Sequence, residues 1–181
     1  MTEAKAFVPV KLICGMISSQ DIVFENAEGL LTDLYGPVDS FSAFIDFTFT
    51  DYYEKEMGEN LKRKFLGFHE LIPPENLSEI KVRTNEIEEE LKLEYKTSQR
   101  IMNLDPGFLT ASSLFMATAK DFAHRVPLQY GIYAHLEFLF GKKTIRTLDW
   151  TYPDYKTEEY QSFFLGIRKI YRKQLKARLG D

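Results

Sequence analysis

The order of its periodic segments is the feature that most constrains how this chain can fold. Apolar residues recur at every second position in a half-buried strand and at every third or fourth position in a surface helix, so the two can be distinguished. Over the first 105 residues the order is strand, helix, strand, strand, helix, strand. The six segments span residues 8–17, 18–35, 41–49, 61–71, 78–95 and 100–104. This order predicts an α+β protein whose residues 1–105 form a ferredoxin-like βαββαβ half.

Short local signals are expected to set the ends of these segments. Ser18 followed by Asp21 resembles a capping box and predicts the start of the first helix. The alternation from Phe41 to Phe49 predicts one continuous strand, with phenylalanines on its buried face. Asp105-Pro106-Gly107 is a strong turn signal and is expected to end the fourth strand of the half.

Residues 106–181 are expected to add a β-hairpin extension and a C-terminal helix within the same single domain. Leu109 to Thr118 suits a strand or a short helix, and we favour the strand. Tyr130 to Phe140 alternates, and the turn after it leads into Thr144 to Leu148, which is typical of a hairpin. Thr157 is expected to cap the last helix. The alternation predicts a buried face of Ile132, Ala134, Leu136, Phe138 and Phe140 opposite Tyr133, His135, Glu137 and Leu139.

Composition narrows the class of protein. A net charge of −4 argues against a general nucleic-acid binder. The single cysteine, Cys14, excludes an internal disulfide and a cysteine metal cluster. No stretch approaches the roughly 20 apolar residues of a membrane span, and residues 1–10 do not resemble a secretory signal. We therefore expect a cytoplasmic protein without a membrane partner.

A charged cluster is the first candidate site. It consists of Asp105, Lys120, Asp121, His124 and Arg125. Lysine, histidine and arginine together suit a phosphate or carboxylate, and Asp105 at a strand end would act as a base or hold a metal. Asp105, Lys120 and His124 are the catalytic candidates. The alternative is an ordinary turn followed by a solvated loop, because such residues are commonly exposed.

A histidine and a glutamate form the second candidate. His135 and Glu137 are two positions apart on a predicted strand, so both side chains point to the same face and would reach one metal ion. His69 or His124 would complete such a site. The polar outer face of a strand gives the same pattern, so the two interpretations stay open.

Two further segments carry candidate binding residues. The aromatic loop from Trp150 to Tyr155, with Asp149 and Asp154, would line a ligand pocket or stack on a base. Tyr133 on the neighbouring strand is added to this set. The alternative is a loop that packs over one end of the core. The basic C-terminal helix would contact nucleic acid or anionic lipid, although cations at a helix C-terminus are also favoured by the helix dipole.

Several motifs together carry a resemblance to a known family. They are Asn103-Leu104-Asp105-Pro106-Gly107, Ala119-Lys120-Asp121 with His124-Arg125, Gly131-Ile132-Tyr133-Ala134, and Trp150-Thr151-Tyr152-Pro153-Asp154-Tyr155. In their order and spacing the chain resembles a bacterial family, domain of unknown function 4416, over nearly its whole length. The resemblance implies no activity and no catalytic residues, although some members carry the label GTP-binding protein.

No motif in this chain supports the GTP-binding label. A phosphate-cradling loop needs Gly-x-x-x-x-Gly-Lys-Ser/Thr, because backbone amides must surround the phosphates and the hydroxyl must hold magnesium. Gly141-Lys142-Lys143-Thr144 lacks the upstream glycine and has an additional lysine. Ala119-Lys120-Asp121 only superficially resembles a guanine-reading motif. The sequence thus argues against a conventional P-loop GTPase.

Three functions follow, with enzymatic activity left open and no cofactor indicated. The first is binding or processing of a small anionic ligand, phosphate-like or nucleotide-like. The second is a non-enzymatic interaction module, including a homodimer through a sheet edge or the aromatic loop. The third is RNA binding through a ferredoxin-like sheet.

Overall fold

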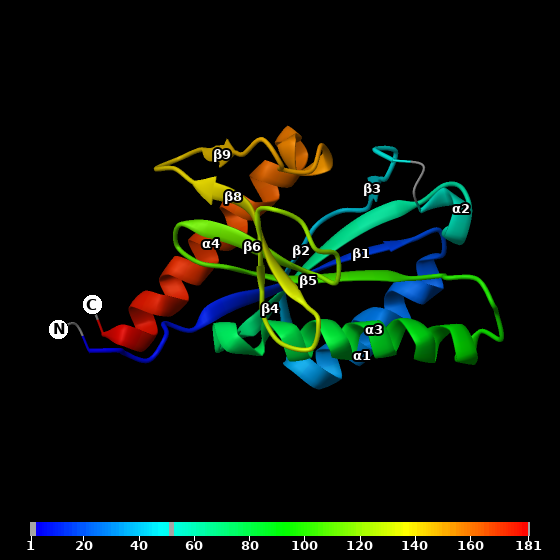
Figure 1. Cartoon of the computed structure of the whole chain (residues 1–181), viewed down its shortest axis with the longest axis horizontal. Helices are drawn as coiled ribbons and strands as arrows, with labels where there is room; N and C mark the ends of the chain where they lie inside the picture. Colours follow the sequence, from blue (N-terminus) through cyan, green and yellow to red (C-terminus); the bar gives the residue numbers. More distant parts are fainter. Residues whose placement is uncertain (1–2, 51–52, 181) are drawn as a thin grey trace.

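The computed structural model describes residues 3–50 and 53–180, and it shows one curled antiparallel sheet with helices on both faces (Figure 1). The α+β class expected from the sequence is confirmed. The strands are β1 (Val10–Ser18), β2 (Val38–Phe41), β3 (Ile45–Asp46), β4 (Lys62–Ile72), β5 (Asn103–Leu109), β6 (Ser113–Thr118), β7 (Arg125–Pro127), β8 (Tyr133–Phe140) and β9 (Ile145–Thr147). The helices are α1 (Asp21–Tyr35), α2 (Glu54–Met57), α3 (Leu77–Glu94) and α4 (Glu158–Leu179), with short 3-10 turns η1 (Pro74–Asn76) and η2 (Asp154–Lys156).

The strands follow the order β2-β4-β1-β5-β6-β8-β7, with β3 added to β4 and β9 added to β8. Every pairing is antiparallel. The central strand β1 is buried along its whole length, because it has a neighbour on each edge and a helical layer on each face. The hairpin of β8 and β9 confirms the one expected from the sequence.

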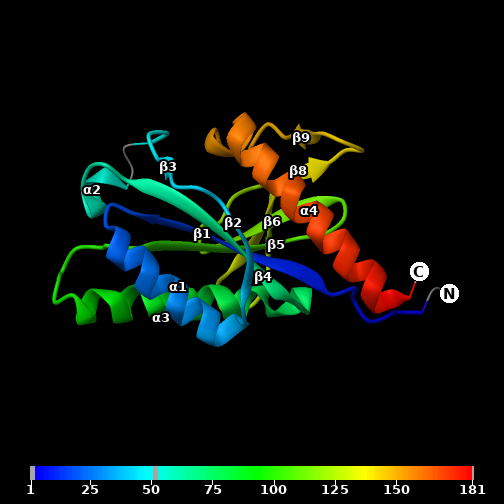
Figure 2. The ribbon, with the colours of Figure 1, turned by 180° about the vertical axis from the view of Figure 1, so that it is seen from behind.

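Two apolar cores lie on opposite faces of the sheet. Alternate β1 residues such as Leu12 and Met16 pack with α1 and α3, whereas Ile13 packs on the other side with α4. Figure 2 shows α1 and α3 together on one side of the strands and α4 crossing the other. Successive side chains of β1 thus point to opposite faces of the sheet, and each face packs against a helical layer. None of the helices in the described residues is long and apolar enough to cross a membrane.

The strand expected over Phe41 to Phe49 is wrong as one continuous element. It is divided into β2 and the two-residue β3, and residues 42–44 lie outside both. Ser42 interrupts the ladder, because its hydroxyl accepts the backbone N–H of Phe65 at 2.9 Å. Only part of the expected buried face is buried: Ile45 and Phe47 are covered, but Phe41 is 69% exposed.

The turn expected at Asp105-Pro106-Gly107 is also wrong. These residues lie inside β5 and pair with Gly15, Cys14 and Ile13 of β1. Pro106 is tolerated because pairing with β6 begins only at Gly107, so one edge of β5 is still open at the proline. The division expected between residues 105 and 106 therefore falls within a strand.

The two expected helix caps had different outcomes. The N-cap of helix α1 is Gln20, two residues after the expected Ser18, and it makes no side-chain cap. The Ser18 hydroxyl instead donates to the Ile101 carbonyl at 2.7 Å, which ties β1 to the segment before β5. Thr157 caps α4 as expected, because its hydroxyl accepts the backbone N–H of Tyr160 at 3.4 Å.

An irregularity in β8 changes which residues are buried. Leu114 pairs with Phe138 but the next residue, Phe115, pairs with Leu136, so Glu137 is an extra residue on the β8 side. Such a bulge shifts the alternation of faces along the strand. His135 and Glu137, expected opposite the apolar face, are 1% and 0% exposed, and Phe138 and Phe140 are buried as well.

Candidate ligand pocket

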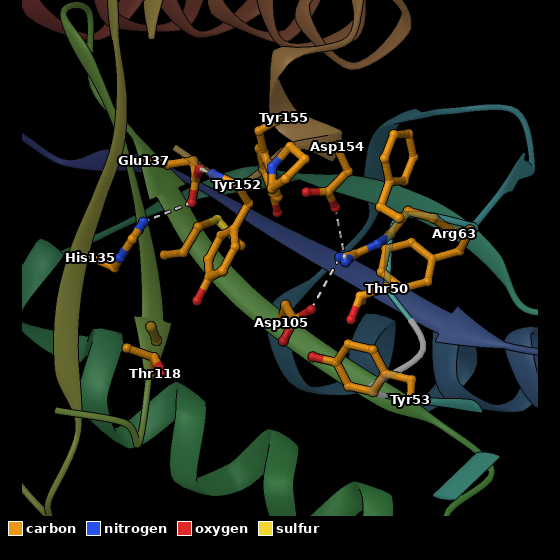
Figure 3. A pocket seen from close by; sticks show the side chains of 15 residues that line it. Thr50, Tyr53, Arg63, Asp105, Thr118, His135, Glu137, Tyr152, Asp154 and Tyr155 are labelled. Carbon is orange, nitrogen blue, oxygen red and sulfur yellow. Dashed lines mark hydrogen bonds and ion pairs between the residues drawn. The ribbon is translucent and has the colours of Figure 1, made fainter. Parts of the chain in front are cut away.

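A cavity of about 430 Å³ opens on the α4 side of the sheet (Figure 3). It is bounded by β4, β5, β6 and β8, by Phe47, Phe49, Thr50 and Tyr53, and by the loop leading into α4. Its polar lining combines a guanidinium, three carboxylates, a histidine and several hydroxyls. The lining residues are Phe47, Phe49, Thr50, Tyr53, Arg63, Asp105, Met116, Ala117, Thr118, His135, Glu137, Tyr152, Pro153, Asp154 and Tyr155.

Arg63 is held between two carboxylates at one end of the pocket. Its Nη1 donates to Asp105 Oδ2 at 3.1 Å, and its Nη2 lies 3.6 Å from Asp154 Oδ2. The Arg63 and Asp154 side chains are 4% and 7% exposed, whereas Asp105 is 25% exposed. A guanidinium so buried needs such partners, because removing a charge from water costs several kcal/mol, as a rough figure.

The sheet register explains how Arg63 reaches Asp105. Gly15 of β1 pairs with Phe65 on one side and with Asp105 on the other, so β1 separates the two charged residues. A Cβ atom at Gly15 would lie 2.6 Å from Arg63 Nη1. The missing side chain of Gly15 thus leaves the space through which the guanidinium crosses β1.

Aromatic rings surround this charge cluster. The Arg63 guanidinium lies 5.1 Å from the Phe47 ring and 5.3 Å from the Phe65 ring. Burial raises the pKa of Tyr155, and the neighbouring Asp154 adds to that shift against the opposing effect of Arg63. Burial also raises the pKa of Asp154, although Arg63 opposes it. The low-dielectric surroundings therefore strengthen every electrostatic contact made there.

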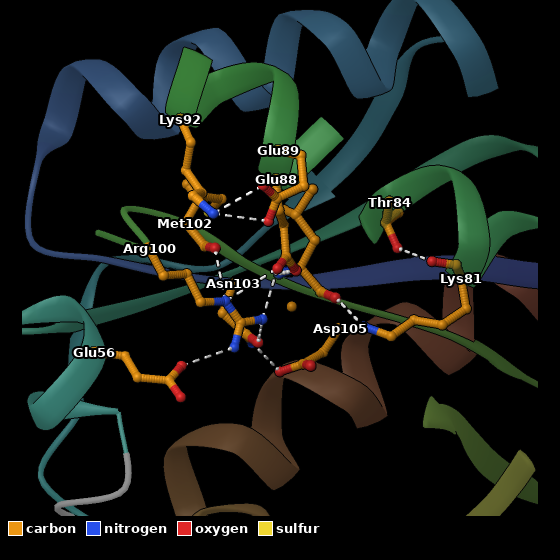
Figure 4. A network of polar contacts seen from close by, with 12 residues as sticks. Glu56, Lys81, Thr84, Glu88, Glu89, Lys92, Arg100, Met102, Asn103 and Asp105 are labelled. Atoms are coloured by element: carbon orange, nitrogen blue, oxygen red, sulfur yellow. Dashed lines mark hydrogen bonds and ion pairs between the residues drawn. The ribbon is translucent and has the colours of Figure 1, made fainter. Parts of the chain in front are cut away.

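Asp105 also joins the pocket to a second polar network (Figure 4). Asn103 Nδ2 donates to Asp105 Oδ2 at 2.7 Å, and Asn103 Oδ1 accepts from Arg100 Nη2 at 2.5 Å. Arg100 in turn donates to Glu88 of α3 at 2.7 Å. Glu88 Oε1 accepts the backbone N–H of Leu104 at 2.7 Å. Both of these contacts use Asp105 Oδ2, and no described residue makes a hydrogen bond to its other oxygen, Oδ1.

His135 and Glu137 lie at the other end of the pocket. His135 Nε2 and Glu137 Oε2 are 3.0 Å apart, yet their alignment does not meet hydrogen-bond geometry, and neither atom has another partner among the described residues. Glu137 Oε1 accepts the backbone N–H of Tyr152 at 2.7 Å. The Tyr152 ring stacks on His135 with centroids 5.2 Å apart. Both side chains are therefore fixed in place while keeping an unsatisfied polar atom.

Arg125 determines which nitrogen of His135 carries the proton. Its Nε donates to His135 Nδ1 at 3.2 Å, and arginine cannot accept a hydrogen bond. Nδ1 must therefore be the acceptor, and the ring proton lies on Nε2. Arg125 also donates to the Tyr152 hydroxyl at 2.8 Å and to the Lys120 carbonyl at 2.6 Å.

His124 contacts the same histidine from outside the pocket. Its Nε2 lies 3.1 Å from His135 Nδ1, and its ring stacks on Trp150 with centroids 4.6 Å apart. Burial lowers the pKa of His124, and the neighbouring His135 and Arg125 lower it further. His124 thus extends the contacts around His135 without lining the pocket.

The structure brings only part of the predicted site together. Asp105, His135, Glu137 and Asp154 line the pocket. His124, Arg125 and Trp150 support it from outside, through the contacts above and the bond from Trp150 to the Leu136 carbonyl. Lys120 and Asp121 are exposed on the segment before β7, and Tyr133 lies at the start of β8, none of them in the lining.

Sequence reasoning missed Arg63, Gly15 and Tyr53, whereas Tyr152 belongs to the aromatic loop that was expected to line a pocket. Arg63 belongs to Lys62-Arg63-Lys64, which has the appearance of an exposed basic run. A usable signal was its position two residues before Phe65, since residues two apart in a strand share a face. The role of Gly15 carries no such signal, because it depends on which strands lie on either side of β1.

The metal hypothesis is not supported by the grouping of side chains. His135 and Glu137 share a face as expected, but His69 lies on β4 beside Asp39, 3.6 Å away. Within residues 3–50 and 53–180, no three histidine, cysteine, aspartate or glutamate side chains come together as a metal site would require. His135 and Glu137 both line the pocket.

The fold and the pocket define a small α+β protein with a buried, charged cavity. The chain belongs to the family described as Domain of unknown function (DUF4416), whose model matches residues 8–171. This confirms the family resemblance drawn from the motifs. No curated protein and no solved structure matches the chain.

Proposed function

We propose that this protein binds a small organic molecule in the pocket on the α4 side of the sheet. One observation carries the proposal: four residues with a carboxylate, guanidinium or imidazole group, each at most 5% exposed as a whole residue, line one cavity. They are Arg63, His135, Glu137 and Asp154. Ionisable groups are rarely buried to this extent without a structural partner or a functional role. The cavity volume of about 430 Å³ also suits a small ligand.

The polar and apolar parts of the pocket have different roles in this proposal. Asp105 Oδ1 would accept a hydrogen bond from the ligand, because Oδ2 is already bound by Arg63 and Asn103. Phe47, Phe49 and Tyr53 supply apolar surface on the same side. A few fixed polar groups within aromatic walls are the usual composition of a small-molecule site.

An anionic ligand, expected from the sequence, would meet few free cations here. Arg63 is the one cationic side chain in the described lining, and it is already paired with Asp105 and Asp154. Lys120 lies outside the lining, and Arg125 is engaged by His135 and Tyr152. A phosphate-like or nucleotide-like ligand stays a prediction, and it is included in the test below.

The proposal is tested by a thermal-shift screen with small molecules of every charge, nucleotides included. A Thr118→Trp substitution would fill the pocket, because Thr118 lines it at the end of β6. Thr144→Trp, at an exposed position before β9, is the matched control. We expect ligands that stabilise the wild type and the Thr144→Trp variant but not the Thr118→Trp variant. Ligands that stabilise all three proteins equally would show binding elsewhere.

We also propose that the first half is ferredoxin-like. Support comes from the antiparallel order β2-β4-β1-β5 and from α1 and α3 packing on the same face. Helix α4 covers the opposite face of β1 and β4, where RNA-binding modules of that fold stack bases. This covering gives the RNA-binding hypothesis no support.

A homodimer and a cytoplasmic location stay predictions. The surface best suited to a homodimer is the terminal strand β7 with its neighbours, where Phe122, Val126 and Tyr130 are more than 60% exposed. Apolar groups on an open strand edge favour pairing with another chain. Light scattering of the wild type and a Val126→Lys variant tests the dimer. A monomer at high protein concentration would contradict it.

A further inference from the structure

The charges around the pocket do not balance. Asp105, Glu137 and Asp154 are three carboxylates, and Arg63 is the one cation in the described lining. The remaining lining residues other than His135 are aromatic, aliphatic or hydroxyl-bearing. The sign of the excess charge therefore depends on the protonation of His135 and on charges just outside the lining.

His135 does not supply the missing positive charge. Its Nδ1 faces the Arg125 Nε–H at 3.2 Å, so a second ring proton on Nδ1 would point at another donor. The ring is therefore neutral, with its proton on Nε2 facing Glu137. When Arg125 is counted with the lining, three carboxylates face two guanidinium groups. Arg100, joined to Asp105 through Asn103, is balanced by its own partner Glu88, so one negative charge is left in excess.

The unsatisfied atoms give a second and independent indication. Glu137 is 0% exposed, and its Oε2 lies 3.0 Å from His135 Nε2 without hydrogen-bond alignment, so it has no hydrogen-bond partner among the described residues. Arg63 Nε and His135 Nε2 also lack a partner, but both are donors on side chains that already lie beside carboxylates. A buried carboxylate oxygen without a donor is costly, because water no longer solvates it. A positive ligand in the pocket would offset this cost, whereas an anion would increase it.

The pocket also offers a place for such a ligand. Asp105 is the most accessible of the three carboxylates, with 25% of its side chain exposed against 7% for Asp154. In Figure 3, Asp105 lies between the end with Arg63 and the end with His135 and Glu137. Phe47, Phe49 and Tyr53 line the same cavity. Aromatic faces attract cations through the ring quadrupole.

We infer that the ligand of this pocket is an organic cation, of the amine or guanidine class, whose N–H groups donate to Asp105. The inference rests on the small-molecule function proposed above and adds the ligand class. The aromatic walls contact the carbon skeleton of the ligand. Glu137 and Asp154 attract the cation electrostatically without a hydrogen bond to it. Arg63 holds Asp105 in position.

The test uses three probes of similar shape and different charge: 2-phenylethylamine, 2-phenylethanol and 3-phenylpropionate. Their binding to the full chain is measured by calorimetry and located by amide chemical shifts. We expect the amine to bind about tenfold more tightly than the alcohol, and the carboxylate to bind most weakly. Added salt should weaken the binding of the amine and leave the binding of the alcohol unchanged.

Two variants separate charge from shape. Asp105→Asn keeps the size of the side chain. We expect it to weaken the binding of the amine about tenfold and the binding of the alcohol less than about twofold. Glu137→Gln should also weaken the binding of the amine. This substitution leaves the ion pairs of Arg63 unchanged, because Arg63 is paired with Asp105 and Asp154. Asp33→Asn, exposed on α1, is the matched control and should change nothing.

The outcomes distinguish this inference from the proposed function. Equal or tighter binding of the alcohol or the carboxylate in the pocket overturns the cation class and leaves small-molecule binding intact. If neither these probes nor the wider screen gives a ligand that Thr118→Trp blocks, both proposals fail. Amine binding that is unchanged in both Asp105→Asn and Glu137→Gln also overturns the cation class.

Discussion

Arg63 of β4 reaches Asp105 of β5 across the central strand β1, with 3.1 Å between Nη1 and Oδ2. Gly15 lies at the crossing point and leaves room for the guanidinium. This contact joins two strands that do not pair with each other, and Asp154 adds the loop before α4 to the same charge cluster. Arg63 therefore connects β4, β5 and the loop before α4 at one end of the pocket.

Replacing Arg63 with methionine should strongly destabilise the protein. The substitution leaves the buried Asp154 without its cation and removes the partner of Asp105. We expect a loss of about 3–5 kcal/mol in the free energy of unfolding, as for other broken buried ion pairs. Urea denaturation followed by circular dichroism measures the loss.

Arg83 provides the matched control for Arg63. Its ion pairs with Glu86 and Glu90 lie on the surface of α3, where its side chain is 34% exposed. Arg83→Met should cost no more than about 1 kcal/mol, because water replaces a surface pair readily. Equal losses in the two variants would contradict the special role of the buried guanidinium.

Gly15→Ala should displace the Arg63 guanidinium. The new methyl group would meet Nη1 at 2.6 Å and the Phe65 ring at 3.0 Å, so one of them must move. We expect a loss of about 1–3 kcal/mol in unfolding free energy, as for other overpacked sites. Gly29→Ala on α1 has open space around it and should instead stabilise the helix by roughly 0.5–1 kcal/mol. If Gly15→Ala stabilised the protein, the space between Gly15 and the Arg63 guanidinium would not be crowded.

Glu88 should make stability depend on pH. Burial raises its pKa above the ordinary 4.5, against the opposing effects of Lys81 and Arg100. A carboxyl whose pKa is higher in the folded chain stabilises the fold fully below its unfolded pKa, and that contribution is lost as pH rises through the folded value.

The pH dependence is measured against a Glu88→Gln variant, which cannot titrate at this position. We expect the unfolding free energy of the wild type, relative to Glu88→Gln, to fall as the pH rises from 4.5 to 7. Glu89→Gln, exposed on the same helix, controls for the general effect of removing a carboxylate. A wild-type advantage that grows with pH would refute the sign of the shift.

His135 should carry its proton on Nε2 at neutral pH. Arg125 Nε holds Nδ1 as an acceptor at 3.2 Å, so long-range ¹H–¹⁵N spectra should show an unprotonated Nδ1. In Arg125→Met this donor is lost, and we expect the two neutral tautomers to mix. The exposed His69 is an internal reference in the same spectra. A protonated Nδ1 in the wild type would remove the argument for a neutral ring.

The features that depend on neighbouring residues were predicted well. Thr157 caps α4, and the turn after Phe140 leads into a hairpin. His135 and Glu137 share a face, because side chains two apart in a strand point the same way. Such features are set within a few residues, so their pattern is visible in the chain.

The failures all involve residues whose neighbours are distant in sequence. Asp105-Pro106-Gly107 has the composition of a turn, but pairing with β1 holds it extended. The extra residue at Glu137 is defined only against β6, and it brings an expected polar face into the interior. At the first site, pairing with a neighbouring strand outweighed the local preference for a turn. At the second site, the bulge shifted the period-two alternation of faces along the strand.

The sequence by itself determined the α+β class, most of the helices and strands, and the candidacy of Asp105, His135, Glu137 and the aromatic loop. Only the tertiary structure decided that Arg63, from an apparently exposed basic run, crosses Gly15 to Asp105 and is buried beside Asp154. The reason is physical: the surroundings of a charge depend on which strands and loops meet around it, and that depends on contacts between residues far apart in the chain.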